Sequence, residues 1–243
     1  MTRAGFGRAV ITPPTPVQLA GFSDRHEPAT RVHDDLEARA VYLAGDDDTA
    51  VCLVVCDLLG MSAEFADPVR DAVGAALGLG RDAVLTASTH THAGPSAIAG
   101  TEVLGWPTPD GYAQILVDGC HAAAVAARKG AEPVELRYAR APLPDGLSIN
   151  RRGLPYDPSF AMLDARRSDG SRVGVLANIA IHPVALGPQC LAVSTDWVGP
   201  FRAALEEGAG GTAVLLSGAL GDVNPRPHAH PEEHGDFAEA AIL

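Results

Sequence analysis

Apolar residues occur along the chain in short runs, some continuous and some alternating with polar residues, as is typical of β-strands. Three longer segments instead repeat apolar positions with helical spacing, at residues 63–77, 111–129 and 198–207. Because consecutive strands are interrupted by only a few helices, the pattern predicts a mixed α/β fold, with β-sheets layered against helices rather than a strict βαβ repeat. The predicted strands cover residues 8–11, 37–43, 50–56, 83–87, 134–138, 160–164, 172–179 and 212–216.

Polar and glycine residues mark the ends of the predicted helices. Asp110 is expected to cap the second helix and Asp196 the third, while Gly130 is expected to end the second. A further helix is predicted to begin at Phe237, and the sequence given ends before that helix could bury an apolar face. The pattern therefore predicts that the unit over residues 1–243 is incomplete at its C-terminus.

Composition narrows the classes of partner and location. The chain has 243 residues, 47% of them hydrophobic, which is enough for a substantial core. A formal net charge of −12 argues against binding to nucleic acid or to anionic lipid surfaces. Cys52, Cys56, Cys120 and Cys190 form no Cys-x-x-Cys pair and are predicted to be free, mostly buried thiols. With no signal peptide and no transmembrane segment in view, we expect a cytoplasmic chain, although secretion of a longer parent stays open. The sequence indicates no oligomeric state.

The most informative segment for function follows the predicted strand at 83–87. It has the sequence Ser-Thr-His-Thr-His-Ala-Gly-Pro over residues 88–95. In an extended backbone, residues two apart point the same way, so His90 and His92 are expected to face one pocket. Two imidazoles beside small residues suit a metal site or a metal-plus-acid/base site. A pair of ordinary loop histidines explains the same residues about equally well.

Three other strand ends carry polar side chains. His182 follows an apolar strand and precedes Pro183, Asp222 lies in a Gly-Asp-Val-Asn-Pro segment, and Arg151 follows Ser148-Ile149-Asn150. An arginine in such a place suits an oxyanion or carboxylate, or pairs with surface acids. Asp57, at the end of the strand at 50–56, and Asp222 are candidates to orient a ligand histidine, with turn capping as the simpler role. Several such ends together favour a shared pocket.

These segments, taken in order, resemble the N-terminal catalytic domain of neutral/alkaline non-lysosomal ceramidases. The resemblance includes the opening segment at 5–13, the His-Asp-Asp-Leu-Glu segment at 33–37, Ala-Ile-His-Pro at 180–183 and Val-Ser-Thr-Asp at 193–196. It implies a zinc amidohydrolase that cleaves the N-acyl bond of ceramide or another N-acyl substrate. It also implies that His90 and His182 bind Zn²⁺, that His92 stabilises the oxyanion or moves a proton, and that Arg151 assists near the scissile amide.

The chain also departs from that family. The family completes its zinc site with a glutamate and a tyrosine further downstream and carries a C-terminal immunoglobulin-like domain, and this sequence contains none of these. Asn224 stands where the characterised members have serine. Substitute ligands could come from the tail, although a solvated loop explains the same residues better: His228, His230, Glu232 and His234. The alternative reading is therefore a catalytically inactive fragment that binds lipid or a partner without a complete metal site.

Overall fold

The computed structural model describes the whole chain except residues 1, 48 and 227–243. A five-stranded sheet contains, in spatial order, β5 (Val84–Ser88), β4 (Ala50–Cys56), β3 (Glu37–Ala44), β1 (Arg3–Val10) and β6 (Glu132–Pro133). A four-stranded sheet contains β12 (Thr212–Ser217), β10 (Arg172–Ile179), β9 (Ser159–Arg166) and β7 (Glu135–Pro142). Two short pairs join β11 (Ala192–Val193) to β2 (Arg31–Val32), and β13 (Val223–Pro225) to β8 (Ser148–Asn150). Neighbouring strands run both parallel and antiparallel, so the predicted mixed α/β class is confirmed.

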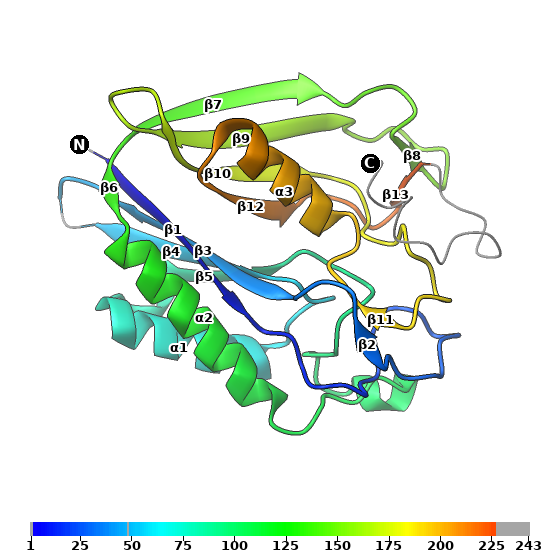
Figure 1. The fold of residues 1–243 in the computed structure, drawn as a ribbon. Helices are drawn as coiled ribbons and strands as arrows, with labels where there is room; N and C mark the ends of the chain where they lie inside the picture. The colour runs from blue at the N-terminus through cyan, green and yellow to red at the C-terminus, as the bar shows by residue number, and fades with distance from the viewer. Residues whose placement is uncertain (1, 48, 227–243) are drawn as a thin grey trace.

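The two main sheets stack face to face, with helices on their outer sides (Figure 1). Helices α1 (Ala63–Leu77) and α2 (Tyr112–Lys129) cover the five-stranded sheet with the largest apolar cluster. Helix α3 (Val198–Ala209) packs against β10 and β12. Side chains alternate along β12, so that Leu215 packs with α3 while Val214 and Leu216 pack between the sheets. The core therefore consists of apolar layers on both sides of each main sheet.

Two glycines explain how closely α2 lies against β1. A Cβ at Gly5 would come within 1.9 Å of the Ala127 carbonyl oxygen, and one at Gly7 within 2.2 Å of the Ala123 carbonyl oxygen. Because only glycine fits at such a distance, the helix backbone packs directly onto the strand. Strand β1 starts at Arg3. The sequence pattern predicts a strand only from residue 8, because these small residues lower the apolar signal.

The three predicted helices are present, but two of their caps differ from expectation. The second helix is preceded by Gly111 in a left-handed conformation and has no side-chain cap, so the prediction for Asp110 was wrong. Trp197 is the N-cap residue of α3, and no side-chain hydrogen bond caps that helix. Asp196 instead accepts hydrogen bonds from the amides of Ala185, Leu186 and Trp197. Gly130 ends the second helix as predicted.

The four cysteines are free and buried, as predicted. Short η-helices cover Arg81–Ala83 and Thr101–Leu104. Among the described residues, no helix combines the length and the apolar character needed to cross a membrane. The predicted helix from Phe237 and the tail residues considered as ligands lie outside the described residues.

Candidate metal centre

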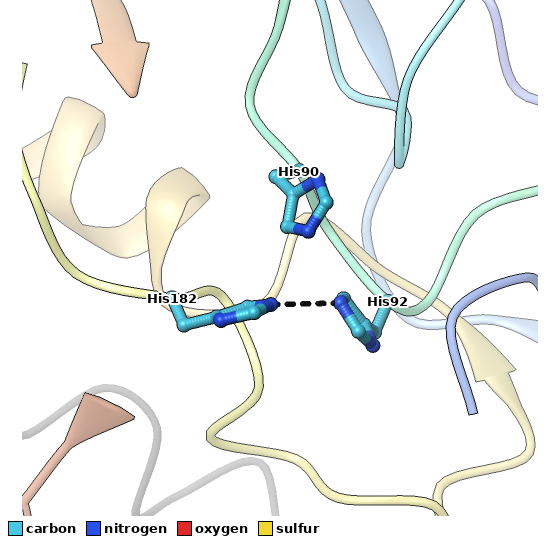
Figure 2. A group of neighbouring side chains, drawn as sticks. All are labelled: His90, His92 and His182. Carbon is cyan, nitrogen blue, oxygen red and sulfur yellow. Dashed lines mark hydrogen bonds between the residues drawn. The ribbon is translucent and has the colours of Figure 1, made fainter. Parts of the chain in front are cut away.

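Three histidines from two different sheets meet where the strands end (Figure 2). His90 and His92 follow β5 of the five-stranded sheet, and His182 follows β10 of the four-stranded sheet. One ligand atom from each ring lies within 4.8 Å of the others. The Nε2 atoms of His92 and His182 are 2.9 Å apart. These three side chains from separate strand ends therefore lie close together.

The loop that carries His90 and His92 does not have the extended backbone that strand alternation assumes. Strand β5 ends at Ser88, and His90 has a φ of 73°, in the left-handed region that non-glycine residues seldom adopt. Backbone hydrogen bonds hold the turn, from Thr89 N to Cys56 O and from His90 N to Leu58 O, each 2.9 Å long. The two rings lie close together, as expected, but a strained turn places them, so the expected extended backbone was wrong.

The surroundings of His90 leave one of its ring nitrogens available. Its Nδ1 lies 2.6 Å from the Leu59 carbonyl oxygen, which can only accept a hydrogen bond. The proton is therefore on Nδ1, and the Nε2 lone pair is available to a metal. Metal-binding histidines commonly have this kind of carbonyl partner, which fixes both the tautomer and the ring orientation.

The segment around His182 is held by its backbone. The His182 amide donates to Val223 O at 2.8 Å, and its carbonyl accepts a hydrogen bond of 3.1 Å from the Trp197 indole Nε1. The His92 amide donates to Pro183 O at 3.4 Å, which links the two histidine loops. His182 is 8% exposed, so the ring stands in a largely dehydrated setting.

Burial keeps the His90 and His92 imidazoles neutral. It is the largest cause lowering the pKa of His90, and it lowers the pKa of His92 to about 3, with further contributions from His182, His90 and the Arg25 guanidinium. A neutral imidazole has the lone pair that metal coordination requires. Three ring nitrogens within 4.8 Å of one another fit a transition metal such as zinc.

Asp57 is buried but bonded elsewhere. Its carboxylate receives two hydrogen bonds from the Arg202 guanidinium, at 2.9 and 2.8 Å, and one from the Glu37 amide at 2.9 Å. These contacts occupy both oxygens and none of them involves an imidazole. Since Asp57 lies between Cys56 and Leu58, whose carbonyls hold the His90 turn, its contribution to the centre is indirect.

Arg151 and Asp222 lie at the ends of the neighbouring β8–β13 strand pair. The Arg151 amide donates to Asp222 O at 2.8 Å, and its guanidinium donates to Gly221 O at 2.9 Å. The Arg151 side chain is exposed, and its hydrogen bonds are to backbone oxygens. Strand β13 follows Asp222 directly and also bonds the His182 backbone, so the β8–β13 strand pair is attached to the edge of the centre.

Sequence reasoning missed the residues that pack around His92. Gly21 lies against its ring, the Phe22 ring centroid is 4.8 Å from that of His92, and Arg25 donates to its carbonyl. These residues are about 70 positions away in the chain, and no local pattern connects them to the histidine. The other described histidines that the sequence left without a role are exposed: His26, His33 and His121.

Comparison with known proteins agrees with this architecture. The crystal structure of neutral ceramidase from Pseudomonas aeruginosa matches with a TM-score of 0.87 at 21% identity, covering 99% of this chain and 43% of that one. A structure described as ceramidase complexed with C2 matches with a TM-score of 0.88 at 20% identity, covering 99% of this chain and 42% of that one. The chain thus spans about two-fifths of the length of these structures. No curated protein sequence matches it.

The family model for neutral/alkaline non-lysosomal ceramidase, N-terminal, matches residues 3–220, which include all three histidines of the centre. Because that match takes in most of the sequence, the chain belongs to the neutral/alkaline non-lysosomal ceramidase family.

Proposed function

We propose that the chain is the metal-binding part of a zinc-dependent amide hydrolase that cleaves the N-acyl bond of a ceramide-like or other N-acyl substrate. The observation that carries the proposal is the cluster of His90, His92 and His182, whose ligand atoms lie within 4.8 Å of one another in the region the family model matches. Family membership supports hydrolysis, and the neutral imidazoles support metal binding.

His90 and His182 are the proposed zinc ligands. The Leu59 carbonyl fixes the His90 ring so that Nε2 is free, and backbone hydrogen bonds on both sides of His182 hold the second ring in place. Bound zinc lowers the pKa of a coordinated water to about 7 and polarises a carbonyl. Catalytic zinc usually has three protein ligands, so this proposal leaves at least one ligand to be supplied by another part of the protein.

His92 is the proposed acid/base or oxyanion-stabilising group. Its Nε2 faces His182, and its ring centroid is 5.2 Å from that of His90, so a substrate at the centre would lie beside it. Cleavage of an amide requires a proton on the leaving nitrogen, and a nearby imidazole can transfer one. Arg151 is the proposed second group near the scissile amide, where a guanidinium stabilises developing negative charge.

An apolar cavity next to the centre supports an acyl substrate. It has a volume of about 250 Å³ and lies between α3 and the loop after β7. Ile181, the chain neighbour of His182, lines it, as does Trp197, whose indole holds the His182 carbonyl. Most of the lining is hydrocarbon, which matches an acyl or alkyl group: Leu143, Leu147, Phe160, Ile181, Trp197 and Phe201.

The second candidate function is a lipid- or partner-binding chain without a complete metal site. The observation in its favour is that, among the described residues, the possible metal-binding cluster contains only His90, His92 and His182, without a carboxylate or thiol ligand. Without zinc, the same apolar cavity would still bind a lipid chain.

Zinc content separates the two candidates. The untagged chain, purified without chelator, is expected to contain close to one zinc per molecule by elemental analysis, and to release the fluorophore-labelled acyl group of a fluorescent ceramide or simpler N-acyl amide. The control is His121→Ala, which removes an exposed imidazole on α2 and should leave the zinc content unchanged. Zinc close to zero in the wild-type chain, even after incubation with zinc, would overturn the proposal and favour the second candidate.

A further inference from the structure

The segment from Ala20 to Arg25 packs around one side of His92 and also contacts the loop that carries Cys190. The Ala20 amide donates to Gly94 O at 2.8 Å, which anchors the segment beside the histidine loop. The Phe22 and His92 ring centroids are 4.8 Å apart, with the rings tilted by 60°. The segment thus contacts the His92 ring through Phe22, while the His92 Nε2 atom faces His182.

Gly21 allows this close approach. Its φ is +108°, and a Cβ at this position would come within 2.4 Å of His92 Nδ1 and 2.5 Å of His92 Cγ. Any side chain at residue 21 would therefore have to displace the imidazole or the segment itself. Glycine at position 21 therefore allows the His92 ring to occupy this position.

Arg25 ties the segment to the backbone of the centre. The residue is 6% exposed, and its guanidinium donates to the carbonyl oxygens of His92, Ala20 at 2.9 Å and Cys190 at 3.4 Å. It also lies over the Phe22 ring, with Cζ 5.1 Å from the centroid. A planar guanidinium can bond several carbonyls at once and stack on an aromatic ring, and an ammonium group reproduces neither well.

We propose that Gly21 and Arg25 are positioning residues that hold the His92 imidazole with its Nε2 directed at His182. The proposal rests on the proposed function for its catalytic consequence, because a displaced His92 would no longer reach the substrate amide. Its structural content is independent of zinc and substrate, and can be tested without either.

The decisive variant is Gly21→Ala, compared with Gly170→Ala. Gly170 lies in the turn between β9 and β10 with a φ of +86°, and a Cβ there would meet nothing within 4 Å. Both variants place a side chain on left-handed backbone, so both carry conformational strain. Only the first also meets an imidazole, and the difference between them isolates that contact.

The primary measurement is the long-range proton–nitrogen spectrum of the histidine rings in the metal-free chain, with the His92 signals assigned by their loss in His92→Gln. Gly21→Ala is expected to shift the His92 ring nitrogen signals while Gly170→Ala leaves them at the wild-type positions. Wild-type signals in Gly21→Ala would overturn the proposal. Because neither zinc nor substrate is present, a failure of the proposed hydrolase function would not affect this result.

Arg25→Lys keeps the test decisive if Gly21→Ala does not fold. It preserves the positive charge but not the planar fork, so the His92 signals are expected to shift again; unchanged signals would contradict the role of Arg25.

In zinc-loaded protein that hydrolyses an N-acyl amide, Gly21→Ala is further expected to lower kcat about 100-fold relative to Gly170→Ala, the scale of loss for a misplaced catalytic group. Equal kcat values in the two variants would contradict the catalytic consequence.

Discussion

The histidine centre and the segment that carries Arg151 are both bonded to the short strand β13 or to the residue before it, but their surroundings differ. The three imidazoles are buried or half-buried, and their rings and backbones are held by carbonyls, an indole and each other. The Arg151 side chain is exposed and bonded to a single backbone oxygen. Strand β13 links the two regions, since Val223 accepts from His182 and the adjacent Asp222 accepts from Arg151.

This difference separates two ways of supplying a reacting group. The centre is preorganised, so its geometry depends on a buried network that tolerates little change. Backbone hydrogen bonding fixes the position of Arg151, and its exposed side chain can adjust to a ligand at little structural cost. Substitutions at the centre should therefore affect metal binding and stability, whereas substitution of Arg151 should affect only reactions that use its charge.

The largest expected effect is loss of metal from the centre. His90→Ala and His182→Ala are each expected to lower zinc affinity by at least about 100-fold, because each removes a proposed ligand from an already sparse set. His92→Ala is expected to retain zinc and to lose amide hydrolysis. Zinc affinity is measured by competition with a chromophoric chelator, with His121→Ala as the matched control on an exposed helix face. Loss of zinc in His92→Ala with retention in the other two would reverse the assigned roles.

The next effect concerns the buried ion pair beneath the His90 turn. Asp57→Asn leaves the Arg202 guanidinium, which is 3% exposed, without its bidentate carboxylate. Removing one partner of a buried pair costs about 3–5 kcal/mol, and here the Arg202 charge would keep only the more distant Glu37 carboxylate, 3.9 Å away. The free energy of unfolding, measured by urea denaturation, is expected to fall by that amount.

A matched exposed pair provides the control for this ion pair. Asp71 and Arg81 also form a bidentate contact, but both side chains are largely exposed. Asp71→Asn is expected to change the unfolding free energy far less than Asp57→Asn, because solvent already screens the charges. Equal losses in the two variants would show that burial of Asp57 does not stabilise the fold around the centre.

Sequence pattern predicted the main elements well where apolar periodicity was strong. Helix α1 occupies the predicted residues, and every predicted strand has a counterpart. The five short strands β2, β6, β8, β11 and β13 were not predicted, because two or three residues carry no periodic signal. Their pairing depends on partners far away in the chain, as with β8 and β13.

At the site, residue type predicted more than backbone geometry did. The sequence identified His90, His92 and His182 as members of one pocket, although the left-handed conformation of His90 was not predictable from strand alternation. Asp57 was proposed as a partner of an imidazole, but its carboxylate is bonded to Arg202, which is 145 residues away. Gly21 and Arg25 were missed for the same reason: their contacts with His92 are purely tertiary.

A smaller effect, dependent on pH, is expected from Asp196, which supports the loop after His182. Burial raises its pKa from 3.8 to about 6, outweighing the hydrogen bonds from three backbone amides, and Asp34 raises it further. The folded chain then binds a proton more tightly than the unfolded chain, so this residue makes the unfolding free energy fall as pH rises from about 4 to about 6. The total change is at most about 3 kcal/mol. Asp196→Asn should remove this slope from urea denaturation measured across that range; an unchanged slope would contradict the shift.

The smallest structural effect is expected from Arg151→Ala. Because this side chain is exposed and its guanidinium bonds to the Gly221 carbonyl, the unfolding free energy should change by no more than about 0.5 kcal/mol, with zinc content unchanged. Hydrolysis of an N-acyl amide should nevertheless slow by about 100-fold if the guanidinium stabilises the oxyanion. Arg152→Ala, at the next exposed position after β8, is the control and should retain wild-type turnover. Wild-type turnover in both variants would remove Arg151 from the reaction and leave catalysis to the histidine centre, whereas a loss confined to Arg151→Ala would show that an exposed, adaptable group completes a preorganised one.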